Sequence, residues 1–229
     1  MSDIHGCIAE FEEALSLIWG KLPNDDVMLI LMGDYIHGGA DNRAVLDKIM
    51  RLQERYGYDK VVALRGNHEE WVLEGQSTID HMIAEYEDGL LMGEDDDEKY
   101  LAWIEKLPLY YTAGNTIFVH AGIDEDAGDL WEWGTDEWIF TSQYPASVGQ
   151  IPNLEMKVVA GHVGTAEISG DPRFHEIFYD GASHYYIDGT VLTSGIIPVL
   201  LVDTDTDTYY QVTEAGEWVV EPYESWRFD

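Results

Sequence analysis

Cysteine is almost absent from the 229-residue chain: Cys7 stands alone, so no disulfide can form within it. Such scarcity is typical of proteins kept in a reducing compartment, and we expect a cytoplasmic protein. The sequence shows no signal peptide and no apolar run near the roughly 20 residues that a membrane helix requires. The longest apolar run, residues 195–202, has the length of a strand. We therefore expect no membrane partner.

Basic residues are also scarce, with 12 Lys and Arg against 45 Asp and Glu, which gives a net charge of −33. A surface of this sign repels phosphate backbones, so we expect no nucleic-acid partner. An anionic substrate would need a local source of positive charge, and bound metal cations are the obvious one. A hydrophobic fraction of 45% argues against disorder, and we expect a single domain over residues 1–229.

Apolar runs of strand length alternate with segments of helical periodicity, which favours an α/β fold. The helices are expected at 10–19, at 41–56 with Asp41 as N-cap, and over most of 70–107. The strands are expected at 27–32, 60–64, 116–120 and 157–162, with mostly β-structure from residue 185 onward.

Metal-binding side chains stand beside glycine where these apolar runs end. In layered α/β folds the ends of strands form a common rim where ligands bind, and glycine lets the chain turn sharply there. Carboxylate, imidazole and amide groups are suitable ligands for divalent transition metals. The stretches are Asp3-Ile4-His5-Gly6, Gly33-Asp34, Gly66-Asn67-His68-Glu69, His120-Ala121-Gly122 and Gly161-His162. Five such stretches predict one shared metal site.

With these motifs in this order, the sequence resembles the calcineurin-like metallophosphoesterases. Within that superfamily it is similar to the branch of phosphoprotein phosphatases and symmetrical diadenosine tetraphosphatases of bacterial or phage type. The family motifs GDxHG, GDxxDRG, GNHE, a strand-end His and a GH pair correspond to the five stretches, and the resemblance reaches about Gly189. It implies a four-layer α/β metallophosphoesterase fold, with two facing mixed β-sheets flanked by helices.

The resemblance also implies two divalent metal ions, with manganese expected and iron or zinc as alternatives. Asp34 would bridge the two ions, and a hydroxide between them would attack phosphorus. His68 would protonate the leaving oxygen. The remaining ligands implied are Asp3 and His5 for one ion, and Asn67, His120 and His162 for the other. We expect Asp3 and His5 to alternate on an extended segment, with Ile4 pointing into the core.

The sequence departs from the family where the phosphate would be gripped. In the GDxxDRG motif, His37 replaces the second Asp and Gly38 replaces the Arg, and Thr135 stands where the family's WxRxxF segment has Arg. Losing one bidentate Arg would weaken binding by roughly 2–4 kcal/mol. His37 could still hydrogen-bond His68, and Arg65 keeps a family-like position. Both are candidate catalytic residues beside His68 and Asp34.

Compensating cations could come from Arg43 or Arg173. We expect altered substrate preference or modest turnover from these departures. Among the other histidines, His81 and His184 are expected to be surface or half-buried, and His175 is expected to pack rather than to line the site from a loop. The family also has a strand before GDxHG, whereas only Met1 and Ser2 stand there, and we expect the numbering to begin at an internal Met.

The function expected from the sequence is metal-dependent hydrolysis of phosphoesters. The main interpretation is a phosphomonoesterase of the Ser/Thr protein phosphatase type, whose partner is a phosphorylated protein or a small-molecule phosphoester. The first alternative is a hydrolase of dinucleoside polyphosphates such as diadenosine tetraphosphate. The second is a degenerate, weakly active or non-catalytic binding module.

Overall fold

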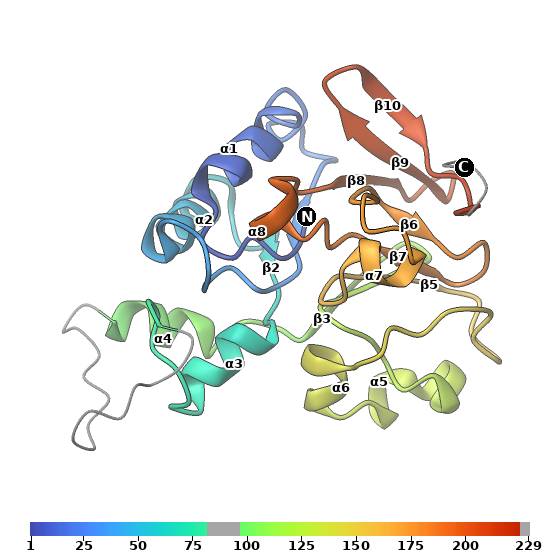
Figure 1. Cartoon of the computed structure of the whole chain (residues 1–229), viewed down its shortest axis with the longest axis horizontal. Coiled ribbons are helices and arrows are strands. Elements are labelled where there is room, and N and C mark those ends of the chain that lie inside the picture. The colour runs from blue at the N-terminus through green and yellow to red at the C-terminus, as the bar shows by residue number, and fades with distance from the viewer. Residues whose placement is uncertain (82–96, 225–229) are drawn as a thin grey trace.

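The computed structural model describes residues 1–81 and 97–224, in which helices and strands alternate along the chain (Figure 1). In chain order they are α1 (Ile8–Ser16), β1 (Leu29–Leu31), α2 (Asn42–Tyr56), β2 (Val61–Ala63), α3 (Asn67–Leu73), α4 (Glu98–Ile104), β3 (Tyr110–Ala113), β4 (Thr116–Val119), the 3-10 helix η1 (Glu125–Leu130), α5 (Trp131–Gly134), α6 (Glu137–Ser142), β5 (Lys157–Ala160), α7 (Thr165–Ser169), β6 (Phe178–Tyr179), β7 (His184–Tyr186), α8 (Val191–Ser194), β8 (Val199–Asp203), β9 (Thr208–Thr213) and β10 (Gly216–Val219).

The expected elements are present, with ends shifted by a few residues. Asp41 caps α2 as predicted, because its carboxylate accepts the Ala44 N–H at 2.8 Å. The prediction of helix over most of 70–107 was partly wrong: α3 and α4 are helical, but residues 74–81 form turns and bends, and residues 82–96 lie outside the described part. None of the helices in the described ranges has the length and apolar character that a bilayer crossing demands.

The strands form one five-stranded mixed sheet and two smaller sheets. The mixed sheet has the order β3-β4-β5-β7-β6, with β4, β5 and β7 parallel and the two outer strands antiparallel. The smaller sheets are the parallel pair β1-β2 and the antiparallel β10-β9-β8.

Alternating side chains along each strand build the layers. In β2, Val61 and Ala63 pack in the cluster that contains Phe11 of α1 and Leu46 of α2. Val62, between them, packs instead in the cluster shared with Phe118 and Val159 of the mixed sheet. The β1-β2 sheet is therefore apolar on both faces, one toward the helices and one toward the mixed sheet.

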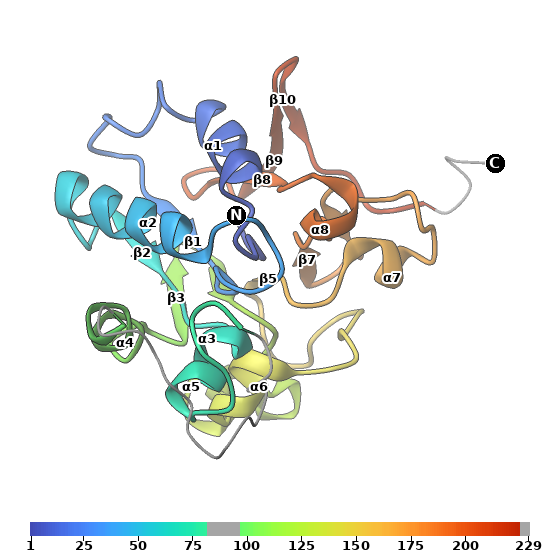
Figure 2. The same ribbon diagram turned by 60° about the vertical axis from the view of Figure 1, so that its left-hand side comes forward.

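The other face of the mixed sheet is covered by the short helices between β4 and β5. Ile117 and Val158, neighbours of Phe118 and Val159 in sequence, pack with Trp131 of α5 and Phe140 of α6. The helices α1 and α2 thus lie on one side of the molecule and α5 and α6 on the other, with the sheets between them (Figure 1 and Figure 2). The predicted four-layer α/β arrangement is confirmed.

One layer differs from the expectation, because it consists of two sheets where one continuous sheet was expected. Between β1 and β8 only the first residues run alongside β1, with the Met32 N–H donating to the Met1 carbonyl at 3.0 Å. An apolar cavity of about 320 Å³ remains between β1 and β8.

Candidate metal centre

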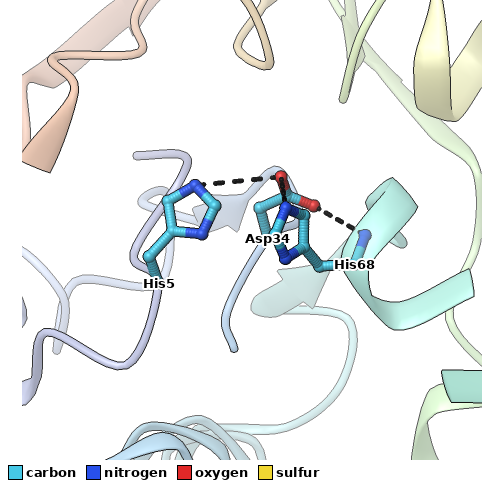
Figure 3. Close-up of side chains that lie close together, drawn as sticks. All are labelled: His5, Asp34 and His68. Carbon is cyan, nitrogen blue, oxygen red and sulfur yellow. Dashed lines mark hydrogen bonds and ion pairs between the residues drawn. The ribbon is translucent and has the colours of Figure 1, made fainter. Parts of the chain in front are cut away.

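The loops that follow the strands bring the predicted histidines around one carboxylate. Asp34 lies at the centre, and the Nε2 atoms of three imidazoles face it (Figure 3 shows two of them). The distance from its carboxylate is 3.4 Å for His120, 3.7 Å for His68 and 3.9 Å for His5. The predicted meeting of strand-end side chains is therefore observed.

The backbone of these loops is strained. Eight non-glycine residues in the described ranges have positive φ, and five of them belong to the candidate site: Asp3, His5, Asp34, His37 and His162. Non-glycine residues rarely adopt this conformation, and such strain gathers at functional sites. The expected extended segment was wrong, since Asp3 and His5 have φ of 54° and 50°. Ile4 between them is buried as predicted.

We call Asp34, Asn67, His120 and His162 the buried half of the centre, because all of them except the partly exposed His162 are buried. His120 is fully buried, and its Nδ1 lies 2.7 Å from the Met32 carbonyl, so its Nε2 is left facing Asp34. The side-chain amide of Asn67 places one terminal atom 3.2 Å from both Asp34 oxygens and 3.1 Å from His162 Nδ1. Asp34, His120 and His162 offer donor atoms that all lie within 4.8 Å of one another.

This donor set fits a divalent cation. A carboxylate and imidazole lone pairs repel one another at such distances unless a proton or a cation lies between them. Turned one way, the Asn67 amide satisfies the cluster through its NH₂; turned the other way, it adds its oxygen as a further ligand. Imidazole, carboxylate and amide oxygen are together a common set for first-row transition metals.

We call His5, Asp34 and His68 the open half; their donor atoms also lie within 4.8 Å of one another. The His5 side chain is 16% exposed, against 0% for His120, and its Nδ1 lies 3.3 Å from the Ile36 carbonyl.

Asp3, the other ligand predicted for the ion held by His5, is in neither group of donors. Its carboxylate accepts the His162 backbone N–H at 3.1 Å, and burial raises its pKa to about 6. Its ligand role stays a prediction.

The predicted hydrogen bond between His37 and His68 is confirmed. Their Nδ1 atoms lie 2.9 Å apart, and His37 Nε2 lies 2.8 Å from the Thr78 carbonyl oxygen. The Trp71 ring packs against His68, with 4.5 Å between ring centroids. Burial lowers the pKa of both imidazoles, that of His68 to about 4.

Charge within the centre is shared between acids and imidazoles. Burial alone would raise the pKa of Asp34, but the His120 and His68 rings outweigh it and hold that pKa well below its usual range. Burial would likewise lower the pKa of His120, but Asp34 outweighs it and raises that pKa to about 10. A divalent cation competes for the same lone pairs, so metal binding here releases protons.

Sequence reasoning missed Glu69, which holds the central loop in place. Its buried carboxylate accepts the backbone N–H groups of Asp34 and Tyr35, each at 2.8 Å, and of Gly66 at 3.0 Å. The signal was its acidic side chain directly after Asn67-His68. Asn42 plays a similar part, accepting the His37 N–H at 2.8 Å.

The three candidate arginines bond groups outside the metal centre. Arg65 donates to the carbonyls of Glu105 at 3.1 Å and Leu107 at 3.5 Å, and its catalytic role stays a prediction. Arg43 is paired with Asp80 and Asp97, and Arg173 is paired with Asp171. In the described ranges, no ion pair joins an arginine to Asp34 or Asp3.

The two positions where the family has Arg are filled differently. A Cβ added to Gly38 would lie 2.7 Å from Leu192 Cδ1, so Leu192 occupies that space. The Thr135 hydroxyl donates to the Trp131 carbonyl and accepts the Asp124 N–H, which is a structural role at the end of α5. Charge on a phosphate would thus have to be offset by cations other than these side chains.

Of the remaining histidines, His184 was predicted wrongly. It is 2% exposed and lies between two carboxylates, 2.8 Å from Asp180 and 2.9 Å from Glu125. His81 is exposed, and His175 bonds the Thr190 hydroxyl at 2.9 Å, as expected of residues outside the site.

Comparison with known families and relatives agrees with this geometry. The model of the calcineurin-like phosphoesterase family matches residues 1–196. Two relatives are symmetrical bis(5'-nucleosyl)-tetraphosphatases: that of Wigglesworthia glossinidia brevipalpis is 31% identical over 125 residues (54% of this chain, 43% of that protein), and that of Nitrosospira multiformis is 28% identical over 124 residues (54% and 42%). The chain thus spans about half the length of the curated relatives it matches.

Solved structures share the fold at low identity. A cold-active protein tyrosine phosphatase superposes with a TM-score of 0.62 at 13% identity, covering 97% of this chain and 78% of that one. A putative diadenosine tetraphosphatase gives 0.56 at 16% identity, covering 97% and 92%. At such identities these similarities show the fold alone.

Proposed function

The chain belongs to the calcineurin-like phosphoesterase family, and on that premise we propose that it hydrolyses bis(5'-nucleosyl) tetraphosphates symmetrically, to two nucleoside diphosphates. The observation that carries the proposal is the pair of donor groups that share Asp34. The relatives named as symmetrical tetraphosphatases favour this substrate over phosphoprotein. It replaces the phosphomonoesterase interpretation as the main one.

Two divalent cations, with manganese as the expected metal, would activate water for attack on phosphorus and offset charge on the phosphoryl oxygens. Asp34 would contact both ions. Asn67, His120 and His162 would hold the ion of the buried half, and His5 would hold the ion of the open half. Glu69 keeps the Asp34 loop in register by accepting three backbone N–H groups.

The departures from the family motif also favour an anhydride substrate. A phosphoanhydride releases a phosphate anion, which is a far weaker base than the alkoxide of serine. Such a leaving group depends less on acid assistance than an alkyl ester does. The strongly negative surface favours a compact substrate over a nucleic acid, whose backbone it repels.

The test uses metal-free protein supplied with MnCl₂ and offered bis(5'-adenosyl) tetraphosphate, a phosphoserine peptide or p-nitrophenyl phosphate. Products are separated by anion exchange. We expect ADP as the sole nucleotide product and faster turnover than on the peptide. AMP with ATP would contradict symmetrical cleavage, and preference for the peptide would restore the protein phosphatase interpretation. Two bound ions without turnover on any substrate would support the binding module.

A further inference from the structure

Three imidazoles face Asp34, and two of them are fixed in the same way. His120 Nδ1 lies 2.7 Å from the Met32 carbonyl, and His5 Nδ1 lies 3.3 Å from the Ile36 carbonyl. A carbonyl oxygen only accepts, so each Nδ1 carries a proton, and each Nε2 is the nitrogen that faces the carboxylate and binds a cation when it gives up its own proton. Metal-binding histidines usually donate their second ring N–H to a carbonyl or carboxylate in this manner.

His68 is also fixed with its Nε2 toward Asp34, but its Nδ1 is held by a second imidazole and not by a carbonyl. Its Nδ1 contacts no carbonyl and lies 2.9 Å from His37 Nδ1, while His37 Nε2 lies 2.8 Å from the Thr78 carbonyl. That carbonyl makes His37 Nε2 the protonated nitrogen, so neutral His37 offers a lone pair at Nδ1. His68 must then supply the proton of the shared bond from its own Nδ1. Its Nε2 is then the nitrogen that faces Asp34 and is placed to bind a cation.

The neutral form of His37 follows from its surroundings. It is 1% exposed, and the hydrogen bonds of its ring in the described ranges go to His68 and to Thr78, neither of which is a carboxylate. A buried imidazolium without a hydrogen-bonded carboxylate is costly. The family motif places an Asp at this position, so the uncharged partner of His68 is a property of this chain.

The distances suit a cation between these donors. His68 Nε2 lies 3.7 Å and His5 Nε2 lies 3.9 Å from the same Asp34 oxygen, Oδ2 (Figure 3). Ligands at roughly 2.1 Å from a metal ion lie about 3 Å apart when adjacent and about 4.2 Å apart when opposite. The observed separations fall between these limits.

We propose that His68 is a ligand of the cation in the open half, together with His5 and Asp34, and that His37 and the Thr78 carbonyl are the groups that position it. His68 then has no proton at Nε2 to give to a leaving group. Water adds to phosphorus as the anhydride P–O bond breaks, the leaving diphosphate keeps the electron pair as an anion, and the proton of water passes to solvent. This consequence rests on the proposed function and narrows the substrates to those with phosphate leaving groups.

The first test counts metal ions. Metal-free protein is titrated with Mn²⁺, and the free ion is followed by electron paramagnetic resonance, for the parent, His68→Ala and the matched exposed control His81→Ala. We expect the affinity for one of two ions to fall at least 10-fold in His68→Ala, with no change in the control. Parental affinity for both ions in His68→Ala, with turnover lost, would overturn the proposal and restore the proton donor.

The second test addresses the positioning groups. His37→Phe keeps a flat ring but removes the acceptor for the His68 Nδ1 proton, and we expect about a 10-fold loss for the same ion. His37→Asp restores an acceptor, and we expect affinity within about threefold of the parent. Melting temperatures of both variants separate this effect from misfolding. Equal loss in both variants, or no loss in either, would contradict the positioning role.

A direct readout is the ¹⁵N spectrum of the imidazoles in zinc-loaded protein. The proposal predicts that His68 carries its proton at Nδ1 and has a metal-bound Nε2; a proton at Nε2 would overturn it.

The proposed function and the ligand assignment can fail independently of each other. If His68→Ala loses an ion but the parent does not cleave the tetraphosphate, the function falls and the ligand assignment stands. If the parent cleaves the tetraphosphate while His68→Ala keeps both ions, the proposed function stands and the ligand assignment falls.

Discussion

The two halves of the centre use the same carboxylate but hold their imidazoles differently. In the buried half, His120 is fully enclosed and bonded directly to a backbone carbonyl. In the open half, His5 is partly exposed, and His68 reaches a carbonyl only through His37. Both departures from the GDxxDRG motif, at positions 37 and 38, fall within the segment that lines the open half.

This difference between the two halves matches two requirements of the reaction, which are holding a cation tightly and admitting the substrate. In the buried half, His120 is fully buried and anchored directly to a carbonyl, although His162 is partly exposed, and this rigid ligand favours tight retention of a cation. An exposed set can admit substrate, and changes there alter selectivity while the tight ion stays bound. The comparison therefore predicts that substitutions in the buried half abolish binding and turnover together, and that substitutions in the open half affect one ion.

The largest effect is expected from His120→Ala. It removes a ligand and leaves the Met32 carbonyl and the Asp34 carboxylate buried without their partner. Loss of the ion removes several kcal/mol of transition-state stabilisation, so we expect tetraphosphate hydrolysis to fall roughly 10³-fold or more. Metal analysis after gel filtration should find the buried ion missing. Two ions in this variant would contradict the assignment of the buried half.

A smaller effect is expected from His5→Ala. The buried half is untouched, so one ion should remain per chain, and affinity for the second should fall roughly 10- to 100-fold. Turnover should recover at high Mn²⁺ concentration, because the ion can then bind again by mass action. Failure to recover at saturating metal, with folding intact, would show that His5 does more than hold the ion.

His184, in β7 of the mixed sheet, gives a prediction on how the stability of the fold depends on pH. Burial lowers the pKa of His184, but bonds to Asp180 and Glu125 outweigh it and raise that pKa to about 9. Since this is above the ordinary value, the stabilisation is fully present below about pH 6.5 and is lost as pH rises through about 9. The melting temperature should fall over that range in the parent.

His184→Gln is the matched variant for that measurement. It keeps one polar contact but loses the charge, so it should be less stable at neutral pH by roughly 1–3 kcal/mol. Its melting temperature should also lose most of the pH dependence between 6.5 and 9. An unchanged pH profile would mean that other groups cause the dependence.

The smallest effect is expected from Asp41→Ala, which removes the exposed carboxylate that caps α2 and keeps the backbone N–H that bonds the Gly6 carbonyl. Caps of this kind contribute about 1 kcal/mol, so chemical denaturation should show a loss of that size. The variant should bind both ions and cleave the tetraphosphate like the parent. A change in metal affinity would show that stability and metal binding cannot be separated here, and would weaken every comparison above.

Much of this account could be predicted from sequence because its signals are local. Apolar runs predicted the strands, and Gly33-Asp34 or Gly161-His162 marked where they end. The resemblance of the motifs to a family placed them around one centre. Asp41 was identifiable as a cap because capping depends on neighbouring residues alone.

The rest depends on contacts between distant segments. His184 was predicted to be a surface or half-buried residue because its partner Glu125 lies 59 positions away in sequence. The role of Glu69 depends on backbone N–H groups of a loop 34 to 35 positions earlier, and that of His37 on a backbone carbonyl at Thr78. Backbone groups have no sequence signature, so a network anchored on them is visible only in the folded chain.

The most direct test of the central claim, two ions joined by Asp34, is the electron paramagnetic resonance spectrum of the protein with two equivalents of Mn²⁺. Ions that share a bridging carboxylate are magnetically coupled. The account predicts a coupled dinuclear signal in the parent and its loss in Asp34→Asn. Two uncoupled six-line signals in the parent, with or without turnover, would contradict it.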